Sequence, residues 1–141
     1  MGSTTGKLFD AVEGNSIEKL HKVLYKNPEL LNAPLGKDLP YNCLIRASWR
    51  GSLDMVKYLI EERKADINMV VNGGKPALMV AAEQDYPKVV RYLSKQEGID
   101  LNYVDKFGYN ALDNAIAYGC YKSALVLKKR VSCRFLIFLD F

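Results

Sequence analysis

Apolar residues recur in this chain at a fixed interval of 34 residues, and that interval restricts the fold more than any other feature. The recurring residues are Leu44, Leu78 and Leu112, then Ala47, Ala81 and Ala115, then Leu59, Leu93 and Leu127. Self-similarity with a period of this length indicates a supersecondary unit that is repeated along the chain. The sequence therefore predicts an array of similar units.

The best-defined unit has the layout of two short helices joined by turns. Gly73 and Gly74 form a turn, a short apolar helix is entered through Pro76, and a second helix begins after Asp85. Apolar residues at helical spacing predict both helices. Asp85 stands where Gly51 turns the chain in the preceding unit, and aspartate adopts left-handed backbone conformations more readily than most residues. The unit is therefore predicted to be all-α.

A fainter copy of the unit lies near the N-terminus, with Leu8 in its first helix and Leu20 in its second. If Gly14 is its turn residue, the second helix is shifted by one residue, because Leu20 lies six residues after Gly14 whereas Val56 lies five after Gly51. We therefore count about four units. The first departs most from the pattern, as expected of a terminal unit whose outer face meets water.

The start of each first helix carries a known repeat motif in altered form. The T-P-L-H-x-A segment of ankyrin repeats corresponds to residues 42–47, 76–81 and 110–115, in which leucine and alanine are kept. Threonine is replaced by Asn42, Pro76 or Asn110. Asparagine caps a helix as well as threonine does, and proline suits a first helical turn. Over residues 7–130 the chain resembles an ankyrin-repeat protein.

The resemblance implies an all-α ankyrin-repeat solenoid of about four helix-turn-helix units joined by β-hairpin-like loops. The expected division of the chain is a flexible N-terminus at 1–6, units at about 7–34, 37–70, 71–104 and 105–130, and an apolar tail or cap at 131–141. In this family the hairpin tips and the residues before each turn line a concave groove that commonly contacts partner proteins. We therefore expect the chain to be a monomer that binds another protein.

Carried over position by position, the resemblance gives a set of expected partner-binding residues. They are Tyr41, Trp49, Arg50, Lys75, Glu83, Gln84, Lys106, Phe107, Tyr109 and Tyr118. Tryptophan, tyrosine and arginine are enriched at the energetic centres of protein interfaces. A second interpretation stays open: Trp49 lies flat across a neighbouring helix, and the aromatic tips pack on adjacent hairpins.

Residues for catalysis are scarce. The chain lacks the glycine-rich nucleotide motifs, H-E-x-x-H and G-x-S-x-G, and it contains one histidine, His21. Cys43, Cys120 and Cys133 lack C-x-x-C spacing, which favours neither a disulfide framework nor a zinc site. We expect no enzymatic activity, no cofactor, no metal site, and reduced thiols in the cytosol or nucleus.

The C-terminal segment 131–141 is strongly apolar and does not fit the repeat. It is much shorter than the ~20 residues needed to span a bilayer. Three interpretations are open: a cap on the stack, part of another unit, or a tail that faces a membrane or a partner. Together with the basic residues 128–130, it supports an alternative function as an electrostatic binder of nucleic acid or an acidic membrane. The net charge of +4 is too small to imply nucleic acid by itself.

Overall fold

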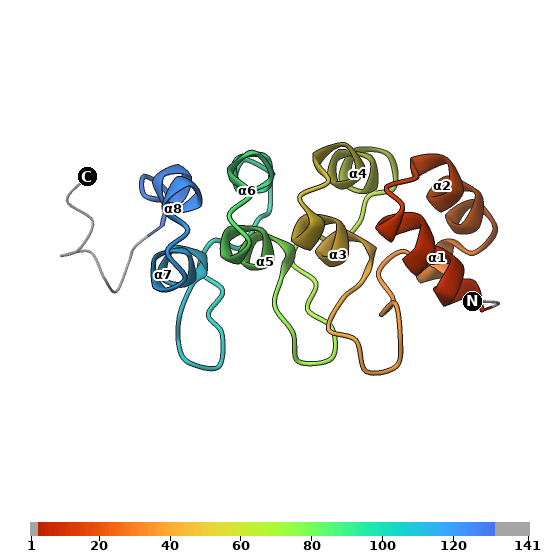
Figure 1. Ribbon diagram of the computed structural model, residues 1–141, viewed down its shortest axis with the longest axis horizontal. Helices are drawn as coiled ribbons and strands as arrows, with labels where there is room; N and C mark the ends of the chain where they lie inside the picture. The colour runs from red at the N-terminus through yellow and green to blue at the C-terminus, as the bar shows by residue number, and fades with distance from the viewer. Residues whose placement is uncertain (1–2, 132–141) are drawn as a thin grey trace.

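The computed structural model describes residues 3–131, in which pairs of helices stack side by side in one row (Figure 1). The pairs are α1 (Thr4–Glu13) with α2 (Ile17–Lys26), α3 (Cys43–Arg50) with α4 (Leu53–Lys57), α5 (Ala77–Glu83) with α6 (Pro87–Ser94), and α7 (Ala111–Ala117) with α8 (Tyr121–Leu127). A 3-10 turn, η1 (Pro28–Leu30), follows α2, and α4 continues into a π-helical turn, η2 (Tyr58–Glu62). Residues 3–131 contain no strand. The predicted all-α solenoid of helix-turn-helix units is confirmed.

The connections that precede α3, α5 and α7 extend on one side of the row (Figure 1). Two of them close as hairpin-like loops: the Leu35 N–H donates to the Tyr41 carbonyl, and the Asp105 N–H donates to the Tyr109 carbonyl, both at 2.9 Å. The Asn72 side-chain amide donates to two backbone carbonyls of the preceding loop, at 2.7 and 3.0 Å. The loops are therefore tied to one another as well as to their helices.

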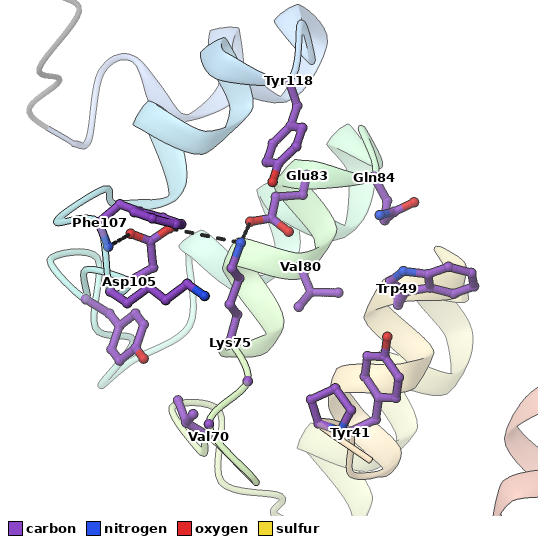
Figure 2. Close-up of a pocket in the computed structure, with 15 residues that line it drawn as sticks. Tyr41, Trp49, Val70, Lys75, Val80, Glu83, Gln84, Asp105, Phe107 and Tyr118 are labelled. Carbon is purple, nitrogen blue, oxygen red and sulfur yellow. Dashed lines mark hydrogen bonds and ion pairs between the residues drawn. The ribbon is translucent and has the colours of Figure 1, made fainter. Parts of the chain in front are cut away.

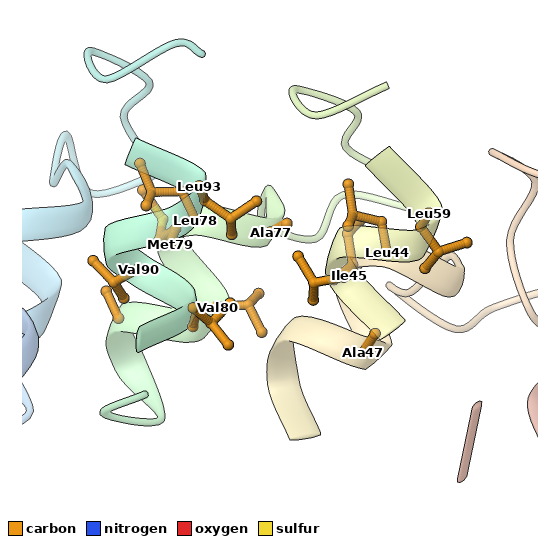
Figure 3. Close-up of a cluster of buried hydrophobic side chains, with 14 of the residues drawn as sticks. Leu44, Ile45, Ala47, Leu59, Ala77, Leu78, Met79, Val80, Val90 and Leu93 are labelled. Atoms are coloured by element: carbon orange, nitrogen blue, oxygen red, sulfur yellow. The ribbon is translucent and has the colours of Figure 1, made fainter. Parts of the chain in front are cut away.

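The residues in 34-residue phase form the shared core. All nine are at most 3% exposed: Leu44, Leu78, Leu112, Ala47, Ala81, Ala115, Leu59, Leu93 and Leu127. Figure 3 shows buried side chains of the second and third units on neighbouring helix pairs, and they belong to one hydrophobic cluster. A helix pair cannot bury its apolar face alone, so each pair is stabilised by its neighbours. The 34-residue periodicity of these leucines and alanines thus reflects the packing of successive units against one another.

Asparagine caps start two of the inner helices, as the motif substitutions predict. The Asn42 Oδ1 accepts from the Ile45 N–H at 2.9 Å, and the Asn110 Oδ1 accepts from the Asp113 N–H at 2.9 Å. The Asp113 carboxylate accepts from the Asn110 N–H at 3.0 Å, which completes a capping box. Pro76 occupies the cap position of α5 with extended backbone, one residue before the helix begins.

The N-terminal helix differs from its predicted limits. It begins at Thr4 and not at Lys7, because the Ser3 hydroxyl accepts from the Gly6 N–H at 3.0 Å and caps the helix. Residues 4–6, expected to belong to a flexible N-terminus, are therefore helical.

The turn of the first unit is also placed differently from the prediction. Asn15 has the left-handed φ of 51°, whereas Gly14 has a φ of −79°. Leu20 then lies five residues after the turn, as Val56 does after Gly51. The predicted one-residue shift of α2 is therefore wrong. The first unit instead lies 36 residues before the second, so the two extra residues belong to the connection.

Each of the next two turns is fitted to the unit that follows it. Gly51 has φ 72°, and a Cβ built there would lie 2.5 Å from the ring of Tyr86. Asp85 takes the same role one unit later with φ 57°. Its Oδ1 accepts from the Ser123 N–H at 3.0 Å and from the Ser123 hydroxyl at 2.9 Å. The turn residues thus bind units together.

Candidate functional site

An open groove of about 610 Å³ lies over the inner helices α3, α5 and α7 and the loops that precede α5 and α7. We call it the central groove. Figure 2 shows Trp49 of α3 and Tyr118, which caps the C-terminus of α7, on opposite sides of α5. Val80 and Glu83 of α5 lie between them and line the groove. Inner helices of successive units therefore supply one continuous surface.

Most of the expected partner-binding residues line this groove. They are Tyr41, Trp49, Lys75, Glu83, Gln84, Lys106, Phe107 and Tyr118. Arg50 and Tyr109 do not. Arg50 turns toward the first unit, where its Nη1 lies 2.9 Å from Glu13. The Tyr109 ring lies 6.4 Å from the Phe107 ring, centroid to centroid, within the last hairpin-like loop.

Trp49 is half-buried, and the guanidinium of Arg46 lies 4.1 Å from the centre of its ring. The same guanidinium lies 5.1 Å from the ring of Tyr41 and 5.8 Å from that of Phe9. A cation over an aromatic face is attracted by the ring quadrupole. Arg46 therefore fixes two aromatic side chains of the groove, and it lies at the variable x position of the repeat motif, to which the sequence assigned no role.

Glu13 joins two guanidiniums into a group that we call the Glu13 cluster, formed by Glu13, Arg46 and Arg50. Its Oε1 lies 2.5 Å from the Arg46 Nε and its Oε2 lies 2.9 Å from the Arg50 Nη1. The hydrogen bond from Arg46 lowers the pKa of Glu13 against the opposing effect of burial, and the charge of Arg50 adds to the lowering. The Glu13 carboxylate is therefore held ionised between two cations.

A second charged group, the Lys75 cluster, is formed by Lys75, Glu83 and Asp105. The Lys75 ammonium pairs with the Glu83 carboxylate and lies 4.0 Å from the Asp105 Oδ2 (Figure 2). Burial raises the pKa of Glu83, against the opposing effect of Lys75. Burial lowers the pKa of Lys75, but the hydrogen bond and charge of Glu83, with the smaller effects of Tyr118 and Asp105, together outweigh burial and raise the net pKa. The shift of Glu83 thus originates in partial removal from water, and that of Lys75 in its ionic partners.

Asp105 is the anchor of the last hairpin-like loop. Its carboxylate accepts from the Phe107 N–H at 2.9 Å, the Tyr109 N–H at 3.0 Å and the Asn114 side-chain amide at 3.1 Å. Burial raises its pKa, but the hydrogen bonds from Tyr109, Asn114 and Phe107 and the charge of Lys75 together outweigh burial, so that the net pKa is lowered. These bonds hold the loop that carries Phe107 against α7.

Within residues 3–131 no group of three or more His, Cys, Asp or Glu side chains could hold a metal ion. His21 lies on α2, where its Nδ1 is 2.9 Å from the Tyr58 hydroxyl, away from the groove. Both cysteines in the described range are free, and burial raises the pKa of Cys43 to about 12, which keeps that thiol protonated.

The alternative basic and apolar site at the C-terminus is described only in part. The Arg130 guanidinium donates to the Ser94 carbonyl at 3.0 Å, so this cation also joins the last two units. Residues 132–141, to which the cap and tail interpretations refer, lie outside the described residues. None of the helices in the described part of the chain has the length and apolar character to cross a membrane.

Comparison with known proteins gives a consistent result. A family model described as ankyrin repeats in three copies matches residues 8–105 and 44–135. An 81-residue stretch is 36% identical to an NAD-dependent deacetylase, sir2B, of Dictyostelium discoideum, covering 57% of this chain and 10% of that protein. An 82-residue stretch is 30% identical to a protein named as a putative ankyrin repeat protein of Rickettsia bellii, covering 56% of this chain and 22% of that protein. The chain thus matches only a small part of the length of these two relatives.

Proposed function

Because this chain belongs to the ankyrin-repeat family, whose repeats generally serve as protein-protein interaction modules, we propose that it binds a partner protein in the central groove. This proposal is supported by the position of the expected partner-binding residues. Eight of them come from three units and line one groove. A surface made by neighbouring units suits a partner segment that crosses several inner helices.

The binding energy is proposed to come mainly from Trp49 and Tyr118. Tyr118 is 62% exposed, which is more than stacking of α7 requires. Trp49 is held by the Arg46 guanidinium with part of its surface open to the groove. Rigid aromatic side chains lose little conformational entropy on binding, and they are frequent anchors of interfaces.

We further propose that the protein is not an enzyme, and that its likeness to the deacetylase reflects shared repeats. The matched stretch is 81 residues long and covers 10% of the deacetylase, and residues 8–105 and 44–135 of this chain match the ankyrin-repeat model. Incubation with NAD and an acetyl-lysine peptide should release no nicotinamide. Release that depends on residues of this chain would contradict this part of the proposal. The cytosolic or nuclear location stays a prediction.

The proposal is tested by affinity capture with the intact chain and with a Trp49→Ala/Tyr118→Ala variant. Loss of an interface anchor costs about 2 kcal/mol or more, so each ligand of the intact chain should bind the variant about thirtyfold more weakly or worse. The matched control is Tyr25→Ala/Tyr121→Ala, which removes two exposed tyrosines from the outer helices α2 and α8. Circular dichroism should show equal helix content in all three proteins. Partners retained by the groove variant but lost from the control would contradict the proposal.

A further inference from the structure

An excess of positive charge lies beside the central groove, at the Glu13 cluster. One carboxylate lies between two guanidiniums, at 2.5 Å from Arg46 and 2.9 Å from Arg50. One negative charge cannot neutralise two positive ones, so the cluster keeps a net charge of +1. The side chain of Arg50 is 36% exposed, compared with 15% for Arg46, so the uncompensated charge is presented mainly by Arg50, next to Trp49.

At the opposite end of the groove, the carboxylates are turned inward and a lysine is turned outward. The side chains of Glu83 and Asp105 are 15% and 5% exposed, and both lie within 4.0 Å of Lys75. Lys106 is exposed and lines the groove, with its ammonium 5.2 Å from the ring of Phe107. Among residues 3–131 no carboxylate lies within ion-pair distance of Lys106. At this end of the groove, a ligand therefore meets the exposed Lys106 more readily than the two carboxylates.

The aromatic part of the groove is formed by Trp49, the neighbour of Arg50 in the sequence, and by Tyr118. Trp49 and Tyr118 stand on opposite sides of α5 (Figure 2), and the buried side chain of Val80 lies between them. Each end of the row of inner helices over which the groove lies thus supplies one aromatic ring and one cation, Trp49 and Arg50 from the second unit and Tyr118 and Lys106 from the fourth. A matching ligand needs apolar groups at its centre and negative charge on both sides, because complementary charges at the rim steer association and exclude wrong partners.

We propose that the occupant of the central groove is a protein segment with one or two large apolar side chains flanked on both sides by aspartate or glutamate. This inference rests on the proposed function, since it names the chemistry of the partner at the same groove. Trp49 and Tyr118 contact the apolar side chains, and Lys106, which lines the groove, pairs with one acidic flank. The other flank extends past Trp49 to Arg50, which lies outside the groove with 36% of its side chain exposed. A segment with basic flanks meets like charge at both ends and is rejected.

The test is selection of short random peptides displayed on phage, followed by affinity measurement with synthetic copies. Peptides selected by the intact chain should carry an aromatic or leucine anchor with acidic residues on both sides. An Arg50→Gln/Lys106→Glu variant should bind these peptides about tenfold more weakly, since each exposed charge contributes a few-fold. Added salt should weaken binding to the intact chain more than binding to this variant. The matched control, Lys88→Gln/Lys122→Glu, changes two exposed lysines of the outer helices and should bind as the intact chain does.

The outcomes separate this inference from the proposed function. The selected peptides could depend on Trp49 and Tyr118 and yet show no excess of acidic residues, or bind the Arg50→Gln/Lys106→Glu variant as tightly as the intact chain. Either result would contradict the acidic flanks but not the groove as the binding site. Selected peptides that bind Trp49→Ala/Tyr118→Ala as well as they bind the intact chain would overturn the groove itself. Equal displacement of the peptides by a DNA oligonucleotide would overturn the assignment to a protein segment.

Discussion

The Glu13 cluster and the Lys75 cluster occupy the two halves of the same inner-helix surface with opposite charge arrangements. In the first, one carboxylate lies between two guanidiniums; in the second, one ammonium lies between two carboxylates. Both join neighbouring units, since Glu13 belongs to α1 and Arg46 to α3, while Lys75 precedes α5 and Asp105 precedes α7. The comparison shows that polar contacts between units need no repeated sequence, whereas the apolar contacts follow the 34-residue phase.

The largest expected loss of stability comes from a substitution in the apolar core, which holds together the units that carry both clusters. Leu93 is fully buried in α6, and Leu93→Ala should lower the free energy of unfolding by about 2 to 5 kcal/mol, because it removes transfer energy and leaves a cavity. Urea denaturation followed by circular dichroism measures this loss. The control Leu125→Ala alters a side chain of α8 that is 52% exposed and should change stability by less than about 0.5 kcal/mol. Equal losses would show that the phased leucines do not hold the units together.

A smaller difference should separate the two clusters when each loses a cation. Lys75→Met leaves Glu83 and Asp105 largely buried without their ammonium and should cost about 1 to 3 kcal/mol. Arg46→Met leaves Glu13 paired with Arg50 and should cost about 1 kcal/mol, mainly through lost cation–π contacts. Urea denaturation of both variants gives the comparison. A Lys75→Met/Glu83→Gln variant should recover part of the larger loss, and no recovery would contradict the account of the Lys75 cluster.

The smallest expected effect is on the pH dependence of stability. The pKa shifts of Glu13 and Glu83, one in each cluster, have opposite signs. The pKa of Glu13 is lowered, so its stabilisation is present above the ordinary value of 4.5 and is lost as pH falls below it. The pKa of Glu83 is raised, so its contribution is present below 4.5 and is lost as pH rises through the higher folded-state pKa. Below pH 4.5, Glu13→Gln should lose less stability than the wild type does. Between neutral pH and 4.5, Glu83→Gln should lack the gain that the wild type shows on acidification. Urea titrations at several pH values measure both, and parallel curves for the two variants would contradict the assignment.

Much of the fold was predictable because contacts between units are periodic. Leu78 and Leu93 repeat at the same positions in adjacent units, and a repeated requirement for close packing leaves a visible signal in one sequence. The first turn was mispredicted because Gly14 and Asn15 are both residue types that adopt left-handed conformations. The structure selects Asn15, which places Leu20 in the interior.

The candidate site was predictable in outline from the family positions, but its charged contacts were not. Glu13 and Arg46 lie 33 residues apart in the sequence and occur at positions that differ in type from one unit to the next. A pattern of spacing cannot show which of several exposed cations turns toward a given carboxylate. Arg50 is an example. It turns toward Glu13 of the first unit and not into the groove, although its neighbour Trp49 lines the groove.

The turns at Gly51 and Asp85 each fit the unit that follows them, so the units pack well only in their natural order. A second copy of the third unit placed after the first copy would set the Tyr86 ring against Asp85, where the natural neighbour Gly51 leaves room for it. It would also present Val89, which has no hydroxyl, in place of Ser123 to the Asp85 carboxylate. These modules look alike in their leucines, yet they cannot be shuffled or duplicated as interchangeable parts.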